Sequence, residues 1–157
     1  MTDQQNHTPI FNAAMHRRVR ILLIEDSPSD VAMTLEALRD ARIANEMHVV
    51  GDGEEAMDFL LRQGQFTDMS RPDLVILDLN LPKMDGREVL RRMKLDDDLR
   101  TIPVVILTTS AAEADILASY QLQANAYVTK PVGYDAFYKA VRGIEGFWLD
   151  IVRLPSD

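Results

Sequence analysis

The most constraining feature of this chain is an apolar run, Leu74–Leu77, that is followed at once by Asp78. Four large apolar residues in succession are typical of a strand that is buried on both faces of a parallel sheet. In open parallel sheets the ligand crevice lies beyond the carboxyl ends of the strands, so an acid there can meet a ligand. Pro82 and the turn dipeptide Asp85-Gly86 indicate that a loop follows. Taken alone, Asp78 is as readily interpreted as a polar residue that ends the strand.

Composition limits the classes of protein to consider. The 157 residues are 46% hydrophobic, which fits one globular domain with a substantial core. A net charge of -8 argues against nonspecific binding to nucleic acid or to an anionic membrane. The absence of cysteine excludes disulfides, thiol catalysis and thiolate metal sites. Residues 1–17 are polar, so we expect a flexible tail there; with no secretion signal and no membrane-spanning run, we expect a cytoplasmic protein.

Short apolar runs alternate with segments of helical periodicity along the rest of the chain. This alternation predicts an α/β fold, a doubly wound parallel sheet with helices on both faces. Gly64 is expected to end the second helix, before a polar connection at Gln65–Pro72. We assign residues 18–144 to this domain and residues 145–157 to a C-terminal helical extension. The five strands are expected at Val19–Ile24, Glu46–Val50, Leu74–Leu77, Val104–Leu107 and Ala126–Val128.

Polar side chains follow four of these strands. Glu25 and Asp26 follow the first, Asp78 the third, Thr108 the fourth, and Lys130 comes shortly after the fifth. Right-handed crossovers bring these strand ends to one edge of the sheet. Carboxylates about 4 Å apart repel by about 4 kcal/mol per pair at an effective dielectric near 20, so the cluster needs a cation. Oxygen ligands without His or Cys favour Mg²⁺, which is commonly coordinated by a phosphate oxygen as well as by protein ligands.

A phosphoryl group bound at this edge gives each acidic residue a role. Asp78 would attack phosphorus in line as the nucleophile and form an acyl phosphate. Asp26 would bind the metal directly, and Glu25 would support it through water. The main-chain carbonyl of Asn80 is a plausible third protein ligand.

Two other residues would contact the phosphate. Lys130 would pair with one phosphate oxygen, and the Thr108 hydroxyl would donate a hydrogen bond to another. Pro131, directly after Lys130, is a candidate for a cis peptide bond that fixes the loop, although trans is the commoner form.

These motifs together resemble the receiver domain of two-component response regulators. The residues that carry the resemblance are Glu25-Asp26, Asp78–Gly86, Thr108 and Thr129-Lys130-Pro131, within a match from about Val19 to Ile144. One departure is Glu25, because many receivers have two aspartates there. The resemblance implies the flavodoxin-like strand order 2-1-3-4-5. It also implies that a sensor histidine kinase phosphorylates Asp78 and that the acyl phosphate is lost by self-catalysed hydrolysis, with no other enzyme activity.

The resemblance also implies a conformational switch. In receivers, the hydroxyl equivalent to Thr108 moves toward the phosphate, and the aromatic ring equivalent to Tyr127 turns inward. This changes the face formed by the helix at about Glu113–Leu122, the strand Ala126–Val128 and the final helix. The simpler interpretation of Tyr127 is a core aromatic residue.

The final helix extends beyond what a minimal receiver needs. Fewer than 30 residues follow the fifth strand, too few for a DNA-binding domain, so we expect a stand-alone receiver. An apolar stripe at the end of the helix is either additional core or, as we favour, a homodimer contact. The polar connection and the chain ending resemble single-domain regulators that partner bacterial and cyanobacterial phytochrome kinases. The expected dimer residues are Phe147, Trp148, Ile151 and Val152.

Two other classes remain open. A haloacid-dehalogenase-type phosphatase also uses a nucleophilic Asp, Mg²⁺, a Thr and a Lys, but it places its Asp-x-Asp on the first strand. Here Asn80 stands two residues after Asp78, so the acid-base partner is missing. A phosphorylation-independent adaptor is the third class, and the presence of Asp78, Thr108 and Lys130 argues against it.

Overall fold

The computed structural model describes the backbone of residues 18–151 and their side chains, except those of 113 and 147–151. The flexible tail expected at residues 1–17 therefore lies outside the described residues, as does Val152.

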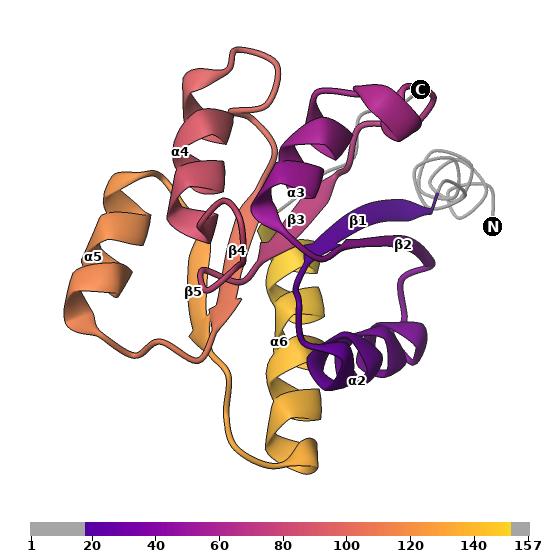
Figure 1. Cartoon of the computed structure of the whole chain (residues 1–157). Helices are drawn as coiled ribbons and strands as arrows, with labels where there is room; N and C mark the ends of the chain where they lie inside the picture. Colours follow the sequence, from indigo (N-terminus) through magenta and orange to yellow (C-terminus); the bar gives the residue numbers. More distant parts are fainter. Residues whose placement is uncertain (1–17, 152–157) are drawn as a thin grey trace, which may run out of the picture.

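Five parallel strands form one sheet at the centre of the molecule (Figure 1). Its order, β2-β1-β3-β4-β5, confirms the predicted flavodoxin-like topology. The edge strands are β2 and β5, and each strand pairs in parallel with its neighbours. The strands are β1 (Val19–Ile24), β2 (Asn45–Val50), β3 (Leu74–Leu77), β4 (Val104–Thr108) and β5 (Ala126–Thr129).

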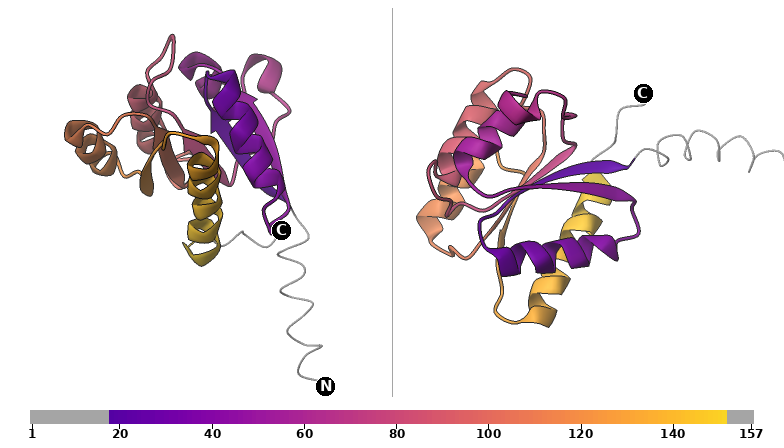
Figure 2. Two further views of the ribbon diagram at one scale, coloured as in Figure 1. Left: turned by 90° about the horizontal axis from the view of Figure 1, so that it is seen from below. Right: turned by 45° about the vertical axis from the view of Figure 1, so that its right-hand side comes forward.

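Helices cover both faces of the sheet. α2 and α6 lie together on one face, and α3, α4 and α5 cover the other (Figures 1 and 2). Three of the helices begin at the side-chain caps Ser27, Asp52 and Asp85, each of which accepts a hydrogen bond from a backbone N–H of the first turn. The helices are α2 (Pro28–Arg39), α3 (Gly53–Leu60), α4 (Gly86–Leu95), α5 (Glu113–Gln121) and α6 (Tyr134–Ile151).

The central strands divide their side chains between two apolar cores. In β3, Val75 and Leu77 pack toward α3 and α4, whereas Leu74 and Ile76 pack toward α2 and α6. All four residues of this strand are buried, as the continuous apolar run predicts. This two-sided packing fixes β3 and thereby the position of Asp78, the residue that follows it.

The connection between α3 and β3 differs from the sequence-based expectation. The helix ends at Leu60 instead of Gly64, and Gly64 begins a short 3₁₀ turn, η1 (Gly64–Phe66). Phe66 is buried, and its ring meets that of Phe59 edge-on at 5.3 Å between centroids. One aromatic anchor within a polar segment thus orders the turn, because burying its ring compensates for the cost of ordering the backbone.

The loop between β3 and α4 is held close to the sheet by two glycines. A Cβ atom on Gly86 would lie 2.3 Å from the carbonyl oxygen of Asp78, and one on Gly53 would lie 2.0 Å from the carbonyl oxygen of Met84. Both distances are far below van der Waals contact. Only glycine therefore permits this loop to lie beside the carboxyl end of β3.

Candidate functional site

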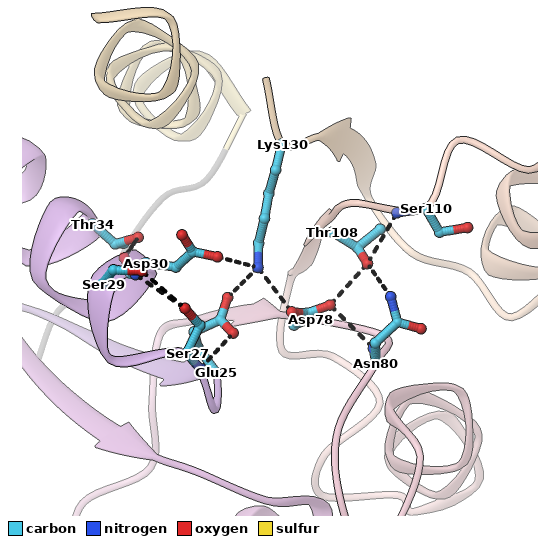
Figure 3. Close-up of polar contacts among 10 residues, drawn as sticks. All are labelled: Glu25, Ser27, Ser29, Asp30, Thr34, Asp78, Asn80, Thr108, Ser110 and Lys130. Atoms are coloured by element: carbon cyan, nitrogen blue, oxygen red, sulfur yellow. Dashed lines mark hydrogen bonds and ion pairs between the residues drawn. The ribbon is translucent and has the colours of Figure 1, made fainter. Parts of the chain in front are cut away.

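The carboxyl ends of the strands bring the expected residues together at one edge of the sheet. Glu25 follows β1, Asp78 follows β3, Thr108 ends β4, and Lys130 follows β5 (Figure 3). Backbone hydrogen bonds fix the ends of these strands against one another: Asp78 N donates to Ile24 O at 3.0 Å, and Lys130 N to Thr108 O at 2.7 Å. The side chains thus converge because their strands are adjacent, although they lie far apart in the sequence.

The Lys130 ammonium occupies the middle of the site. Its Nζ donates to Glu25 Oε1 at 2.5 Å, to Asp30 Oδ2 at 2.8 Å and to Asp78 Oδ2 at 2.8 Å. Burial lowers the pKa of Lys130, but its hydrogen bonds to Asp30, Asp78 and Glu25 outweigh burial, so the net shift is upward. The ammonium is therefore a fixed positive charge.

The carboxylate of Asp78 is held through both of its oxygens. Oδ1 accepts hydrogen bonds from Thr108 Oγ1 at 2.8 Å and from the Asn80 amide at 3.1 Å, while Oδ2 accepts from Lys130. Burial raises the pKa of Asp78, but the hydrogen bonds from Lys130, Asn80 and Thr108 exceed this effect and lower it overall. Asp78 is thus ionised at neutral pH, the form that a nucleophile requires.

Glu25 has the opposite electrostatic balance. Its side chain is 4% exposed, and burial raises its pKa to about 7, although the hydrogen bond from Lys130 acts in the opposite direction. The charge of Asp78 contributes to this upward shift of the pKa, and the Ser27 amide, which donates to Oε2 at 3.1 Å, opposes it. A cation beside Glu25 would favour its ionised form.

Three acids form a cluster that suits a metal ion. One carboxylate oxygen from each of Glu25, Asp26 and Asp78 lies within 4.8 Å of the other two; Asp26 is exposed and the others are buried. A site of oxygen donors that is open on one side fits Mg²⁺, which keeps waters and binds through one or two carboxylates. Asn80 lies beside the cluster, with its Nδ2 donating to Thr108 Oγ1 at 3.4 Å. A ligand role for its main-chain carbonyl remains a prediction.

Sequence reasoning missed Asp30, although it contacts Lys130 directly. The available signal was the helix start at Pro28 shortly after the end of a strand, since this places Asp30 in the first turn beside the sheet edge. The peptide bond between Lys130 and Pro131 is trans, as are all others in residues 18–151.

Tyr127 and Ser110 connect the site to its surroundings. The Tyr127 hydroxyl donates to the Ser110 carbonyl at 2.7 Å, and the Ser110 hydroxyl donates to Asp115 Oδ2 at 2.6 Å. Tyr127 is half-buried and packs against the core on the α3 and α4 face. These contacts tie β5 and α5 to the loop that follows Thr108.

The side chains expected at a dimer contact lie outside the described residues. α6 continues to Ile151, so residues 145–151 of the expected extension at 145–157 are helical. However, the side chains of Phe147, Trp148 and Ile151 are outside the described residues, as is Val152. Their role at an interface stays a prediction.

Among residues 18–151, no helix is both long and apolar enough to cross a membrane.

This fold and site define a class of signalling protein, and comparison with known proteins agrees. Residues 21–142 match the response regulator receiver domain family, so the chain belongs to that family. The predicted family membership is thus confirmed.

Relatives within this family include phytochrome response regulators. The chain is similar to response regulator Rcp1 of Synechocystis sp., at 49% identity over 87% of this chain and 92% of Rcp1. The crystal structure of Mn²⁺-bound Rcp1 superposes with a TM-score of 0.83, covering 87% of this chain and 99% of that one. Phosphorylated RcpA, a cyanobacterial phytochrome response regulator, gives 0.85 at 46% identity, over 89% and 100% of the two chains. The bacteriophytochrome response regulator RtBRR gives 0.70 at 41% identity, over 90% and 85%.

Proposed function

We propose that this response regulator accepts a phosphoryl group on Asp78 from a sensor histidine kinase in a Mg²⁺-dependent reaction. The observation that carries the proposal is the Asp78 carboxylate, which is held between Lys130 and Thr108 beside the acids Glu25 and Asp26. Phosphoryl transfer depends mainly on such positioning and on neutralising charge.

Each residue then has a defined task. An Asp78 oxygen attacks phosphorus, and the bond from phosphorus to the donor atom breaks as the acyl phosphate forms. Lys130 and the Thr108 hydroxyl redirect hydrogen bonds from the carboxylate to phosphoryl oxygens. Mg²⁺, when bound, would neutralise part of the negative charge of the acids and of the phosphoryl group. Its protein ligands would be Asp26 and Asp78, with Glu25 acting through water and Asn80 through its main-chain carbonyl.

The acyl phosphate would change the face formed by α5, β5 and α6, and it would act through Thr108 and Tyr127. Movement of the Thr108 hydroxyl toward a phosphoryl oxygen ends its hydrogen bond to Asp78 and moves the loop that bears Ser110. Tyr127 then exchanges its bond to the Ser110 carbonyl for an inward position, which alters the surface of α5, β5 and α6. Phosphate needs to favour the second state by only a few kcal/mol to shift most of the population.

The partner that we propose is a phytochrome histidine kinase in the cytoplasm. This proposal is supported by the likeness to RcpA and RtBRR, which are phytochrome response regulators by name. We also propose a homodimer that uses the end of α6, where Phe147, Trp148, Ile151 and Val152 supply an apolar stripe in the sequence.

The proposal is tested by incubating the chain with acetyl phosphate and Mg²⁺ and measuring its intact mass. We expect one labile adduct of a single phosphoryl group that is missing in Asp78→Asn. Steady hydrolysis of a phosphate ester would instead indicate a phosphatase. A wild-type chain that takes no adduct from acetyl phosphate or from a kinase would indicate a phosphorylation-independent adaptor.

A further inference from the structure

Asp30 is a fixed part of the site that the proposed reaction does not use. It lies in the first turn of α2, and its Oδ2 accepts a hydrogen bond from Lys130 Nζ at 2.8 Å (Figure 3). Its main chain is fixed on both sides. The Asp30 amide donates to Ser27 Oγ at 3.4 Å, and its carbonyl oxygen accepts from Thr34 Oγ1 at 2.7 Å. The carboxylate is therefore positioned by the helix and does not reach the site by chance.

The contacts of Lys130 leave no free donor for a phosphate. An ammonium has three N–H groups, and the carboxylates of Glu25, Asp30 and Asp78 accept one bond each. A phosphoryl oxygen can thus contact Lys130 only by replacing one of these partners. The side chains of Glu25 and Asp78 are 4% and 7% exposed, whereas that of Asp30 is 21% exposed. Asp30 is thus the most solvent-exposed of the three partners of Lys130.

We propose that Asp30 opposes phosphoryl uptake, by retaining Lys130 in the resting arrangement and by repelling the incoming phosphoryl group. This inference rests on the proposed phosphorylation of Asp78. Glu25 and Asp78 already hold the ammonium from the buried side, so Asp30 is not needed to aim it. Its main effect is to add a negative charge on the more exposed side of a site that receives a dianionic group.

The same charge has the opposite effect on a cation. Asp30 adds to the negative potential around Glu25, Asp26 and Asp78, and this potential attracts Mg²⁺. Replacing Asp30 by asparagine keeps an oxygen that can accept from Lys130 but removes the charge. We therefore expect weaker Mg²⁺ binding and faster phosphoryl uptake, each by about two- to fivefold for a charge that is partly screened by solvent. A variant that was merely damaged in its fold would lose both.

The experiment compares the full-length wild type with Asp30→Asn, Asp30→Ala and the control Glu54→Gln. Glu54 is an exposed acid in the first turn of α3, so the control removes the same charge from a similar helix position. Calorimetry gives the Kd for Mg²⁺. Intact mass gives the initial rate of adduct formation from acetyl phosphate at saturating Mg²⁺, at low and at high salt.

The proposal predicts a higher Kd and a faster rate for both Asp30 variants, a difference that shrinks at high salt, and wild-type values for Glu54→Gln. An unchanged or slower rate in Asp30→Asn, with normal adduct formation in the wild type, overturns the role of Asp30 alone. The same holds if Asp30→Ala is slow while Asp30→Asn matches the wild type, because Asp30 would then aim Lys130. A wild type without adduct overturns the proposed function as well.

Discussion

Arg87 and Asp115 form an ion pair that joins the first turn of α4 to the first turn of α5, with Arg87 Nη2 at 2.7 Å from Asp115 Oδ2. The two residues are 28 positions apart in the sequence. Asp115 also accepts the hydroxyl of Ser110, whose carbonyl accepts the hydroxyl of Tyr127. The loop between β4 and α5, which follows Thr108, is thus tied to β5 through Tyr127 and to α4 through Asp115 and Arg87.

Arg87→Gln should loosen this loop while costing little stability. The pair is partly exposed, so we expect a loss of about 0.5–1 kcal/mol in the free energy of unfolding, measured with urea. Hydrogen exchange of the amides near Ser110 should become faster. The matched control is Arg91→Gln, because Arg91 pairs with Glu88 within α4 itself. Equal exchange near Ser110 in both variants would show that the pair does not restrain the loop.

Lys130→Met should destabilise the metal-free protein, since it leaves the buried carboxylates of Glu25 and Asp78 without their cation. Removing one partner of a buried charge pair costs about 3–5 kcal/mol. We expect about 2–3 kcal/mol here, because protonation of Glu25 relieves part of the repulsion. Urea unfolding with and without Mg²⁺ measures this, and the metal should restore part of the loss. Lys139→Met, at an exposed position of α6, should change stability by less than about 0.5 kcal/mol. Similar losses for the two lysines would contradict the arrangement of the site.

Glu25 should make the metal-free protein more stable as the pH falls. Its pKa is raised from 4.5 to about 7 on folding, mainly by burial, so between these values the folded chain binds more protons than the unfolded chain. This stabilisation is fully present below pH 4.5 and is lost as the pH rises through 7. We expect a difference of about 3 kcal/mol across this range, since each pH unit between the two pKa values contributes about 1.4 kcal/mol.

Urea unfolding of the wild type and of Glu25→Gln at several pH values measures this contribution. The variant should lack the increase in stability at lower pH, and Mg²⁺ should reduce it in the wild type by favouring the ionised carboxylate. The lowered pKa of Asp78 makes the folded protein less stable as the pH falls, but only at pH values below the ordinary pKa of an aspartate. Parallel pH profiles for the two proteins would refute the assignment to Glu25.

Gly86→Ala should disrupt the loop between β3 and α4. The added Cβ would lie 2.3 Å from the carbonyl oxygen of Asp78, a backbone atom that cannot rotate away. We expect a loss of about 2–3 kcal/mol in unfolding free energy and weaker Mg²⁺ binding. Gly143→Ala is the control: its Cβ meets nothing within 4 Å, and alanine in α6 should stabilise by about 0.5–1 kcal/mol. A well-tolerated Gly86→Ala would mean that the loop can move away from β3 without loss.

Much of the fold was predictable because its signals are local. The apolar run Leu74–Leu77 indicated a doubly buried strand, and alternating strands and helices restrict the topology to a few choices. Phe66 was missed because one buried ring in a polar segment produces no periodic pattern. Asp30 was missed for a related reason. The first turn of a helix commonly carries an acid whose only role is to cap the helix or to interact favourably with its dipole.

The sequence by itself determined where each strand ends to within one residue, and the chemistry of the polar residues there, because a short apolar run and the polar residue after it are set by neighbours in the chain. Only the tertiary structure decided that Lys130 is shared among Glu25, Asp30 and Asp78, that burial raises the pKa of Glu25, and that hydrogen bonds lower the pKa of Asp78. Burial and hydrogen bonding compete within the same few ångströms. Their balance depends on distances between residues that lie as many as 105 positions apart, and no local pattern encodes those distances.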